Sequence, residues 1–117
     1  ETLHIPALVA DLERLALRPR FDAILCAGAL EFCPHPERAL RNLGRGLRGH
    51  DARLVAMLPA AGMPGKLYRR FHRRHGFEVQ LFSQKRIGTL ASAAGLHVDE
   101  VNRVGFNYVV RMKRSRT

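Results

Sequence analysis

One stretch of the sequence, residues 21–27 (FDAILCA), restricts the possible folds more than any other. It is a continuous apolar run broken only by Asp22, and Gly28 ends it. Runs of this kind are typical of strands in a parallel sheet that is covered on both faces. We therefore predict an α/β fold in which residues 21–27 form a strand of a parallel sheet.

The residues that follow predict a helix and a second strand. Pro36 suits the first position of a helix, and Gly49 is expected to end it. Apolar residues recur at helical spacing between them, so one face of this helix should pack on the sheet: Leu40, Leu43 and Leu47. Residues 53–58 predict the next strand, which Pro59 terminates.

The last third of the chain predicts one more helix and two paired strands. Ser83 is a suitable N-cap, and Gly95 stands where a helix commonly ends. Residues 98–104 and 106–111 have the pattern of two strands joined at a glycine turn. The basic end, residues 111–116, is expected to be a solvated tail.

Residues 1–20 allow two interpretations. A helix that begins at Pro6 fits the apolar residues Leu8, Val9, Leu12 and Leu15, whereas residues 5–10 also fit a short buried strand. The pattern alone does not decide between them.

Length and composition exclude several classes of protein. A chain of 117 residues has the size of one domain. Cys26 and Cys33 lack metal-ligand spacing, so we expect reduced, buried thiols and no metal site. No apolar stretch reaches the ~18 residues that a membrane span needs, and no secretory signal is present, so a cytoplasmic protein is expected. The chain begins at Glu1 rather than Met, which favours a segment cut from a longer reading frame.

Three segments follow one another in an informative order: residues 10–15 (ADLERL), 21–25 (FDAIL) and 29–40 (ALEFCPHPERAL). They resemble the middle and C-terminal part of class I S-adenosylmethionine-dependent methyltransferases, particularly the small-molecule group related to quinone-biosynthesis enzymes. The resemblance covers nearly the whole chain. It implies a partial Rossmann-like methyltransferase sheet with flanking helices and a C-terminal antiparallel strand pair. Residues 1–117 would then be a single domain, the C-terminal part of a methyltransferase domain.

The resemblance also implies which residues bind the cofactor, S-adenosylmethionine. The family's acidic residue that accepts a hydrogen bond from the adenine amino group matches Asp11. The next backbone N–H, which meets a ring nitrogen in the family, matches Leu12. The turn that lies against the cofactor matches Cys26, Ala27 and Gly28.

This sequence departs from the family pattern at several places. Phe32 replaces the common histidine, and His35 replaces the usual aspartate before Pro36, which removes a good N-cap. The glycine-rich loop of the family has no counterpart here. The family's strand order is 3-2-1-4-5-7-6, so without strands 1 and 2 the strand at 21–27 has a bare edge. Such an edge should recruit the N-terminal segment, another copy of the chain or the missing half.

Residues 63–76 (MPGKLYRRFHRRHG) form the most distinctive segment. At ~100° per residue, one side of this helix is cationic, and the other side carries Leu67, Phe71, Tyr68, His72 and His75. The equivalent segment of related enzymes contributes to the substrate cover, so Tyr68, His72 and His75 are candidates to orient or deprotonate an acceptor. The simpler interpretation is an amphipathic helix that rests on the sheet with its arginines in water.

The function that we expect is methyl transfer from S-adenosylmethionine to a small-molecule or lipid-like acceptor, carried out by the longer protein. The alternative is a noncatalytic basic module whose helix at 64–76 binds nucleic acid or an anionic surface, which the formal net charge of +10 favours. Asp22 and Glu31 are expected to be structural. No serine lies in a nucleophile elbow, so a covalent hydrolase is not expected.

Overall fold

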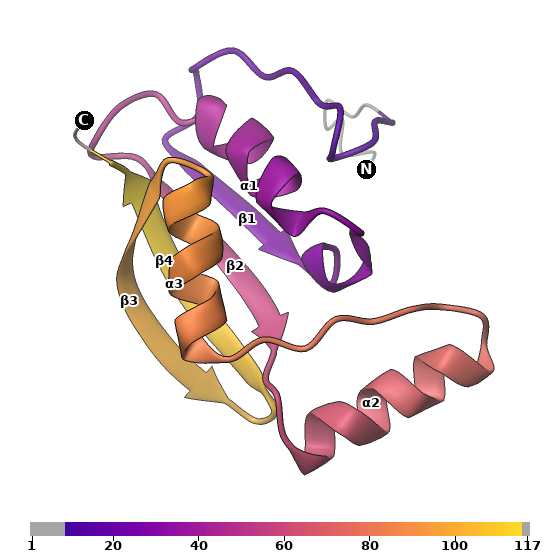
Figure 1. The fold of residues 1–117 in the computed structure, drawn as a ribbon. Coiled ribbons are helices and arrows are strands. Elements are labelled where there is room, and N and C mark those ends of the chain that lie inside the picture. The colour runs from indigo at the N-terminus through magenta and orange to yellow at the C-terminus, as the bar shows by residue number, and fades with distance from the viewer. Residues whose placement is uncertain (1–8, 116–117) are drawn as a thin grey trace, which may run out of the picture.

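The fold is an open four-stranded sheet with helices packed on it (Figure 1). A computed structural model describes residues 9–115. Its elements, in chain order, are β1 (Ala23–Ala27), the 3-10 helix η1 (Leu30–Phe32), α1 (Pro36–Arg45), β2 (Arg53–Pro59), α2 (Met63–Arg74), α3 (Gln84–Ala93), β3 (Leu96–Val104) and β4 (Asn107–Arg114).

The strands lie in the order β1-β2-β4-β3. β1 is parallel to β2, with Leu25 opposite Val55, and β4 is antiparallel to both β2 and β3. This order matches the 4-5-7-6 part of the sheet that the sequence implied. Both the α/β class and the C-terminal antiparallel pair are therefore confirmed. Within residues 9–115 no strand pairs with the outer edge of β1.

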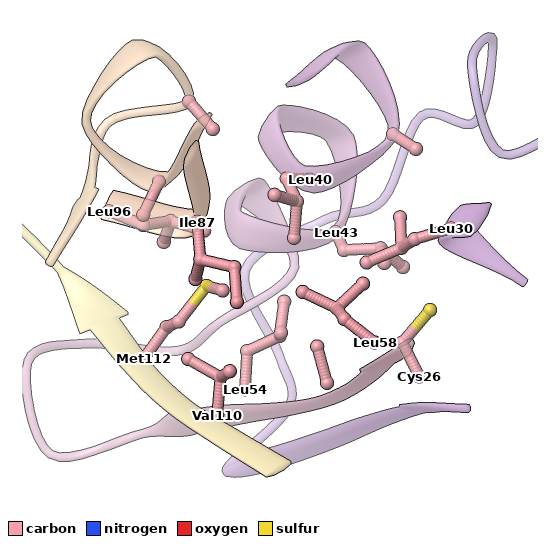
Figure 2. Close-up of a cluster of buried hydrophobic side chains, with 14 of the residues drawn as sticks. Cys26, Leu30, Leu40, Leu43, Leu54, Leu58, Ile87, Leu96, Val110 and Met112 are labelled. Carbon is pink, nitrogen blue, oxygen red and sulfur yellow. The ribbon is translucent and has the colours of Figure 1, made fainter. Parts of the chain in front are cut away.

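The core lies between the sheet and two helices on one of its faces. α1 and α3 cover this face side by side (Figure 1), and Leu40 of α1 and Ile87 of α3 point toward the strands (Figure 2). The strands contribute Leu54, Leu58, Val110 and Met112, all nearly inaccessible to solvent. Burial of these side chains is the main force that holds the layers together.

The opposite face of the sheet is exposed in the described part of the chain. Leu25 of β1 is 76% exposed and Met57 of β2 is 37% exposed. The prediction that the first strand is covered on both faces is therefore wrong for residues 9–115. The reason is that α1 and α3 lie on the same side of the sheet, so only the inward-facing side chains such as Cys26 are buried.

The helix boundaries follow the local signals closely. α1 begins at Pro36, and His35 makes no side-chain cap, as expected from the loss of an aspartate there. The Ser83 side chain accepts a hydrogen bond from the Arg86 N–H at 3.1 Å, which confirms the N-cap of α3. Gly95 follows α3 with a φ of 75°, a conformation that glycine adopts without strain.

Two predicted boundaries are wrong. α1 ends at Arg45 rather than at Gly49, because Leu47 forms a parallel bridge with Phe21 and leaves the helical path. The basic end is not a solvated tail, because β4 continues to Arg114. Met112 is completely buried and lies opposite Leu54 in the register, so this part of the strand completes the core.

Over residues 9–20, the segment before β1 does not form the helix considered for it. Residues 9–20 contain no helix or strand, apart from a turn after Asp11. Leu12, Leu15 and Leu17 are partly buried against the core. The strand alternative at 5–10 lies mostly outside the described residues.

Candidate functional site

The candidate site lies at the carboxyl ends of the parallel strands β1 and β2. β1 ends at Ala27, and Gly28 turns the chain with a φ of 66°. A Cβ atom on Gly28 would meet nothing within 4 Å, so the space beside this backbone is open. Cys26 is buried beneath the turn, whereas Ala27 and Gly28 are exposed. The backbone of the bend is therefore accessible on this side.

Asp11 and Leu12 form a tight turn that is tied to α1. The Glu13 N–H donates to Oδ1 of Asp11 at 3.0 Å, and the Arg14 N–H donates to the Asp11 carbonyl at 3.0 Å. The side-chain amide of the buried Asn42 donates to the Leu12 carbonyl at 2.9 Å. The first of these bonds orients the Asp11 carboxylate, and the last fixes the turn against the helix.

The Asp11 turn lies near the residues that follow the bend. Burial raises the pKa of the Cys33 thiol above its ordinary value, and the neighbouring carboxylates of Glu13, Asp11 and Glu31 raise it further. Cys33 directly follows η1 and is the C-cap of that short helix. Burial raises the pKa of Cys26 to about 11, with smaller contributions from Cys33 and Glu31. Both thiols are free and remain protonated at neutral pH.

A buried carboxylate and a tyrosine meet beside the bend. Glu31 of η1 is 4% exposed, and its Oε2 accepts a hydrogen bond from the Tyr68 hydroxyl of α2 at 3.2 Å. Its Oε1 is buried and has no partner among residues 9–115. Burial raises the pKa of Tyr68, and the charge of Glu31 raises it further. We expected a structural role for Glu31, and its position at this site was not foreseen.

An aromatic cluster joins α2 to the loops around it. The ring centroid of His72 lies 4.5 Å from that of Tyr68 and 5.3 Å from that of Phe32. Tyr68 also lies 5.1 Å from Phe106 in the turn between β3 and β4. An imidazole from α2 is thus placed beside Phe32, the position where the family commonly has its own histidine.

His75 does not join this cluster. It is exposed at the end of α2, and its Nδ1 lies 3.0 Å from the carbonyl oxygen of Phe71 in its own helix. Of the three side chains singled out in this helix, the structure therefore brings together Tyr68 and His72 only.

α2 does not rest on the sheet as the simpler interpretation expected. Leu67 is 63% exposed and Phe71 is 58% exposed, and Gly65 is the buried residue of this helix. α2 projects from the two-layer body in Figure 1. Gly65 explains the arrangement, because its bare backbone lies so close to the Ala60 carbonyl that a side chain would not fit. The predicted apolar side is therefore divided, with Tyr68 and His72 facing inward and the other three residues, Leu67, Phe71 and His75, facing solvent.

Two further properties of residues 9–115 concern metals and membranes. The structure places no three His, Cys, Asp or Glu side chains together in a way that suits a metal ion. None of the helices in this range combines the length and the apolar composition needed to cross a bilayer.

Comparisons with known proteins identify the fold. A family model described as a methyltransferase domain matches residues 1–50. Mitomycin 7-O-methyltransferase superposes with a TM-score of 0.75 at 17% identity, over 92% of this chain and 33% of its own. A methyltransferase from Thermotoga maritima, described as a possible histamine N-methyltransferase, gives 0.75 at 21% identity over 92% of this chain and 63% of its own. Magnesium protoporphyrin IX methyltransferase from Synechocystis PCC 6803, solved with S-adenosylhomocysteine, gives a TM-score of 0.65 at 15% identity, over 92% of this chain and 50% of its own.

These likenesses establish a shared fold over nearly the whole chain. The chain spans about a third of the length of the mitomycin enzyme and 63% of the Thermotoga protein. No curated protein sequence matches it.

Proposed function

We propose that this chain, which has the fold of class I S-adenosylmethionine-dependent methyltransferases and matches their family model over residues 1–50, takes part in methyl transfer from S-adenosylmethionine to a small-molecule or lipid-like acceptor. One observation carries the proposal. The Tyr68 hydroxyl donates to Glu31, just beyond the end of β1, and His72 packs against Tyr68 and Phe32, so both side chains stand next to the Gly28 bend at the carboxyl ends of β1 and β2. Open α/β sheets bind their ligands at this end.

In this proposal the Asp11 turn and the bend hold the adenine side of the cofactor. The Asp11 carboxylate is an acceptor suited to an exocyclic amine, and the Leu12 N–H is a donor suited to a ring nitrogen. The open space beside Gly28 fits a ligand that approaches the backbone closely. Residues 1–117 would form the C-terminal part of the domain, and preceding residues would supply the glycine-rich loop that this sequence lacks.

The acceptor side is assigned to Tyr68 and His72. When bound, the cofactor supplies a methyl group on a sulfonium sulfur, which is electrophilic enough that the protein needs no covalent nucleophile. The protein's task is to position the acceptor and to take its proton. The raised pKa of Tyr68 keeps its hydroxyl protonated at neutral pH, so it is not the base, and because its proton is donated to Glu31 it can contact an acceptor only through its oxygen. His72 is the better candidate for the base.

Binding of S-adenosylhomocysteine tests the cofactor side. In an NMR titration of the chain, and of a version extended upstream, the amides of Leu12 and Gly28 should shift. Asp11→Ala should weaken binding by about tenfold, the effect of one lost hydrogen bond. The matched control is Asp22→Ala, since Asp22 directly precedes the amino end of β1, away from the bend, and its exposed carboxylate pairs with Arg48 at 3.5 Å. Equal losses in the two variants, or shifts confined to another surface, would refute the assignment.

Methyl transfer by the extended protein tests the acceptor side. His72→Gln should abolish proton removal by the protein and lower kcat by at least about 100-fold. If the acceptor is acidic, high pH should partly restore the activity of this variant, because the acceptor then loses its proton without the histidine. His75→Gln changes the same residue type on the same helix but outside the cluster, so it should have little effect. The reverse ranking would show that His75 takes the proton.

A further inference from the structure

The exposed side of α2 combines two kinds of residue that proteins rarely leave together in water. Three apolar residues, which we call the outer stripe, are 68%, 63% and 58% exposed: Met63, Leu67 and Phe71. Five cations accompany them on the same helix: Lys66, Arg69, Arg70, Arg73 and Arg74. α2 contains no acidic residue, and none of these cations forms an ion pair within the described part of the chain.

The outer stripe and the cations form one continuous surface. Leu67, Phe71, Arg70 and Arg74 line a single shallow depression. At ~100° per residue the stripe covers an arc of about 80° around the helix. Arg70 lies at the margin of this arc, and Arg74 lies within it. Tyr68 and His72, which hold the helix to the protein, lie on a different side. The stripe can therefore be laid on a flat surface while the rest of the molecule points away from it.

We infer that α2 docks the protein on the surface of an anionic lipid bilayer. The interface of such a bilayer offers apolar chains below and negative headgroups at the level where the arginines would lie, so one partner satisfies both kinds of residue. Twelve residues give a helix of about 18 Å, which suits a helix lying in the interface and not one crossing it. This inference does not depend on methyl transfer.

Other occupants fit this surface less well. A nucleic acid would neutralise the cations but leave Leu67 and Phe71 in water. A second copy bound through the same face would bring Arg70 and Arg74 against the same two arginines, because a two-fold interface pairs identical patches. Neither alternative uses the outer stripe and the cations together.

Vesicle flotation tests the inference with the whole chain. The protein should float with phosphatidylcholine vesicles that contain phosphatidylglycerol and not with phosphatidylcholine alone. Arg70→Gln/Arg73→Gln/Arg74→Gln should lower the partition coefficient by roughly 100-fold, since each arginine near an anionic surface contributes about fivefold. Leu67→Asp/Phe71→Asp should lower it at least tenfold. Both sets change exposed side chains, so circular dichroism should show an intact fold.

Matched controls separate a docking helix from the general attraction of a chain with a net charge of +10. Arg18→Gln/Arg38→Gln/Arg45→Gln removes the same charge from exposed positions outside α2, and Leu25→Asp/Val104→Asp adds two acids to exposed apolar positions elsewhere. These controls should reduce partition by less than about threefold, because the removed charges are not held at the bilayer surface. If either control set has the same effect as its α2 counterpart, the inference is overturned.

Insertion of the outer stripe can be measured directly, because the sequence contains no tryptophan. In Phe71→Trp the fluorescence should shift to shorter wavelength on mixing with the anionic vesicles, whereas Val104→Trp should not change. An unshifted Phe71→Trp overturns the inference. A second result would also overturn it: the protein does not float with vesicles but binds single-stranded RNA tightly and in a salt-sensitive way, and Leu67→Asp/Phe71→Asp leaves the RNA binding intact.

Discussion

Gly65 determines how closely α2 approaches the body of the protein, and substituting it tests the geometry of the site. It is buried, and a Cβ atom on it would lie well under 3.0 Å from the carbonyl oxygen of Ala60. Leu81 lies on the same side, with its Cδ2 3.3 Å away. Because a backbone carbonyl cannot yield as a flexible side chain can, Gly65→Ala should push the helix outward by about 1 Å. Overpacking of this kind costs about 1–3 kcal/mol.

The same substitution in α3 serves as the control. Gly88 is exposed, and a Cβ atom on it would meet nothing within 4 Å, so Gly88→Ala should stabilise the protein by up to about 1 kcal/mol. The two variants should therefore differ by about 3 kcal/mol in free energy of unfolding, measured by urea denaturation. The NMR signals of Tyr68 should shift in Gly65→Ala only. If Gly65→Ala were as stable as Gly88→Ala, α2 would not lie against Ala60, and the contact between Tyr68 and Glu31 would lose its basis.

Three further predictions concern ionisable groups. Tyr68→Phe removes the donor to the buried Glu31, so the free energy of unfolding in urea should fall by about 1–3 kcal/mol. Burial raises the pKa of Cys26 to about 11, so the folded state holds this proton more tightly than the unfolded state. The resulting stabilisation, about 2 kcal/mol, should be complete below pH 9 and lost as the pH rises toward 11, and Cys26→Ala should remove this part of the stability profile. A hydrogen bond from Arg53 lowers the pKa of Asp99, so stability should decline as the pH falls through that lowered value, and Asp99→Asn should flatten the decline. Profiles that the last two substitutions leave unchanged would contradict the assigned causes.

The elements that the sequence predicted well depend on residues that act on their own backbone. Pro36 and Ser83 start helices, and Gly95 ends one, because of conformations and hydrogen bonds within a few residues. The end of β4 differs from the prediction because the basic residues at 111–116 resemble a solvated tail and conceal the alternation of buried and exposed side chains. Val110 and Met112 point into the core while Arg111 between them is exposed, which is the period of two that identifies a strand.

The contacts that form the candidate site could not be predicted from local patterns. Tyr68 and Glu31 are 37 residues apart, and Asn42 is 30 residues from Leu12. Which of these side chains meet depends on the path of the loops and on the direction in which α2 leaves β2. The resemblance to a family indicated Asp11 and the bend at residues 26–28 as candidate positions. It could do so because both belong to sequence segments that match the family in order. It gave no site role to Glu31, whose partner Tyr68 lies on α2, outside the sheet.

Helical periodicity shows which residues share a side of α2, but not which side meets the protein. The informative residue is Gly65, because close approach of two backbones requires a glycine, and Tyr68 and His72 lie on the same side as that glycine. Leu67 and Phe71 are consequently left outside with the arginines. If both proposals hold, one helix carries the acceptor side on its inner face and the lipid surface on its outer face. Gly65→Ala should then lower methyl transfer by displacing His72, yet leave vesicle binding unchanged, because the outer stripe remains exposed. A parallel loss of both activities would mean that α2 had unfolded and that neither effect reports on the geometry of its faces.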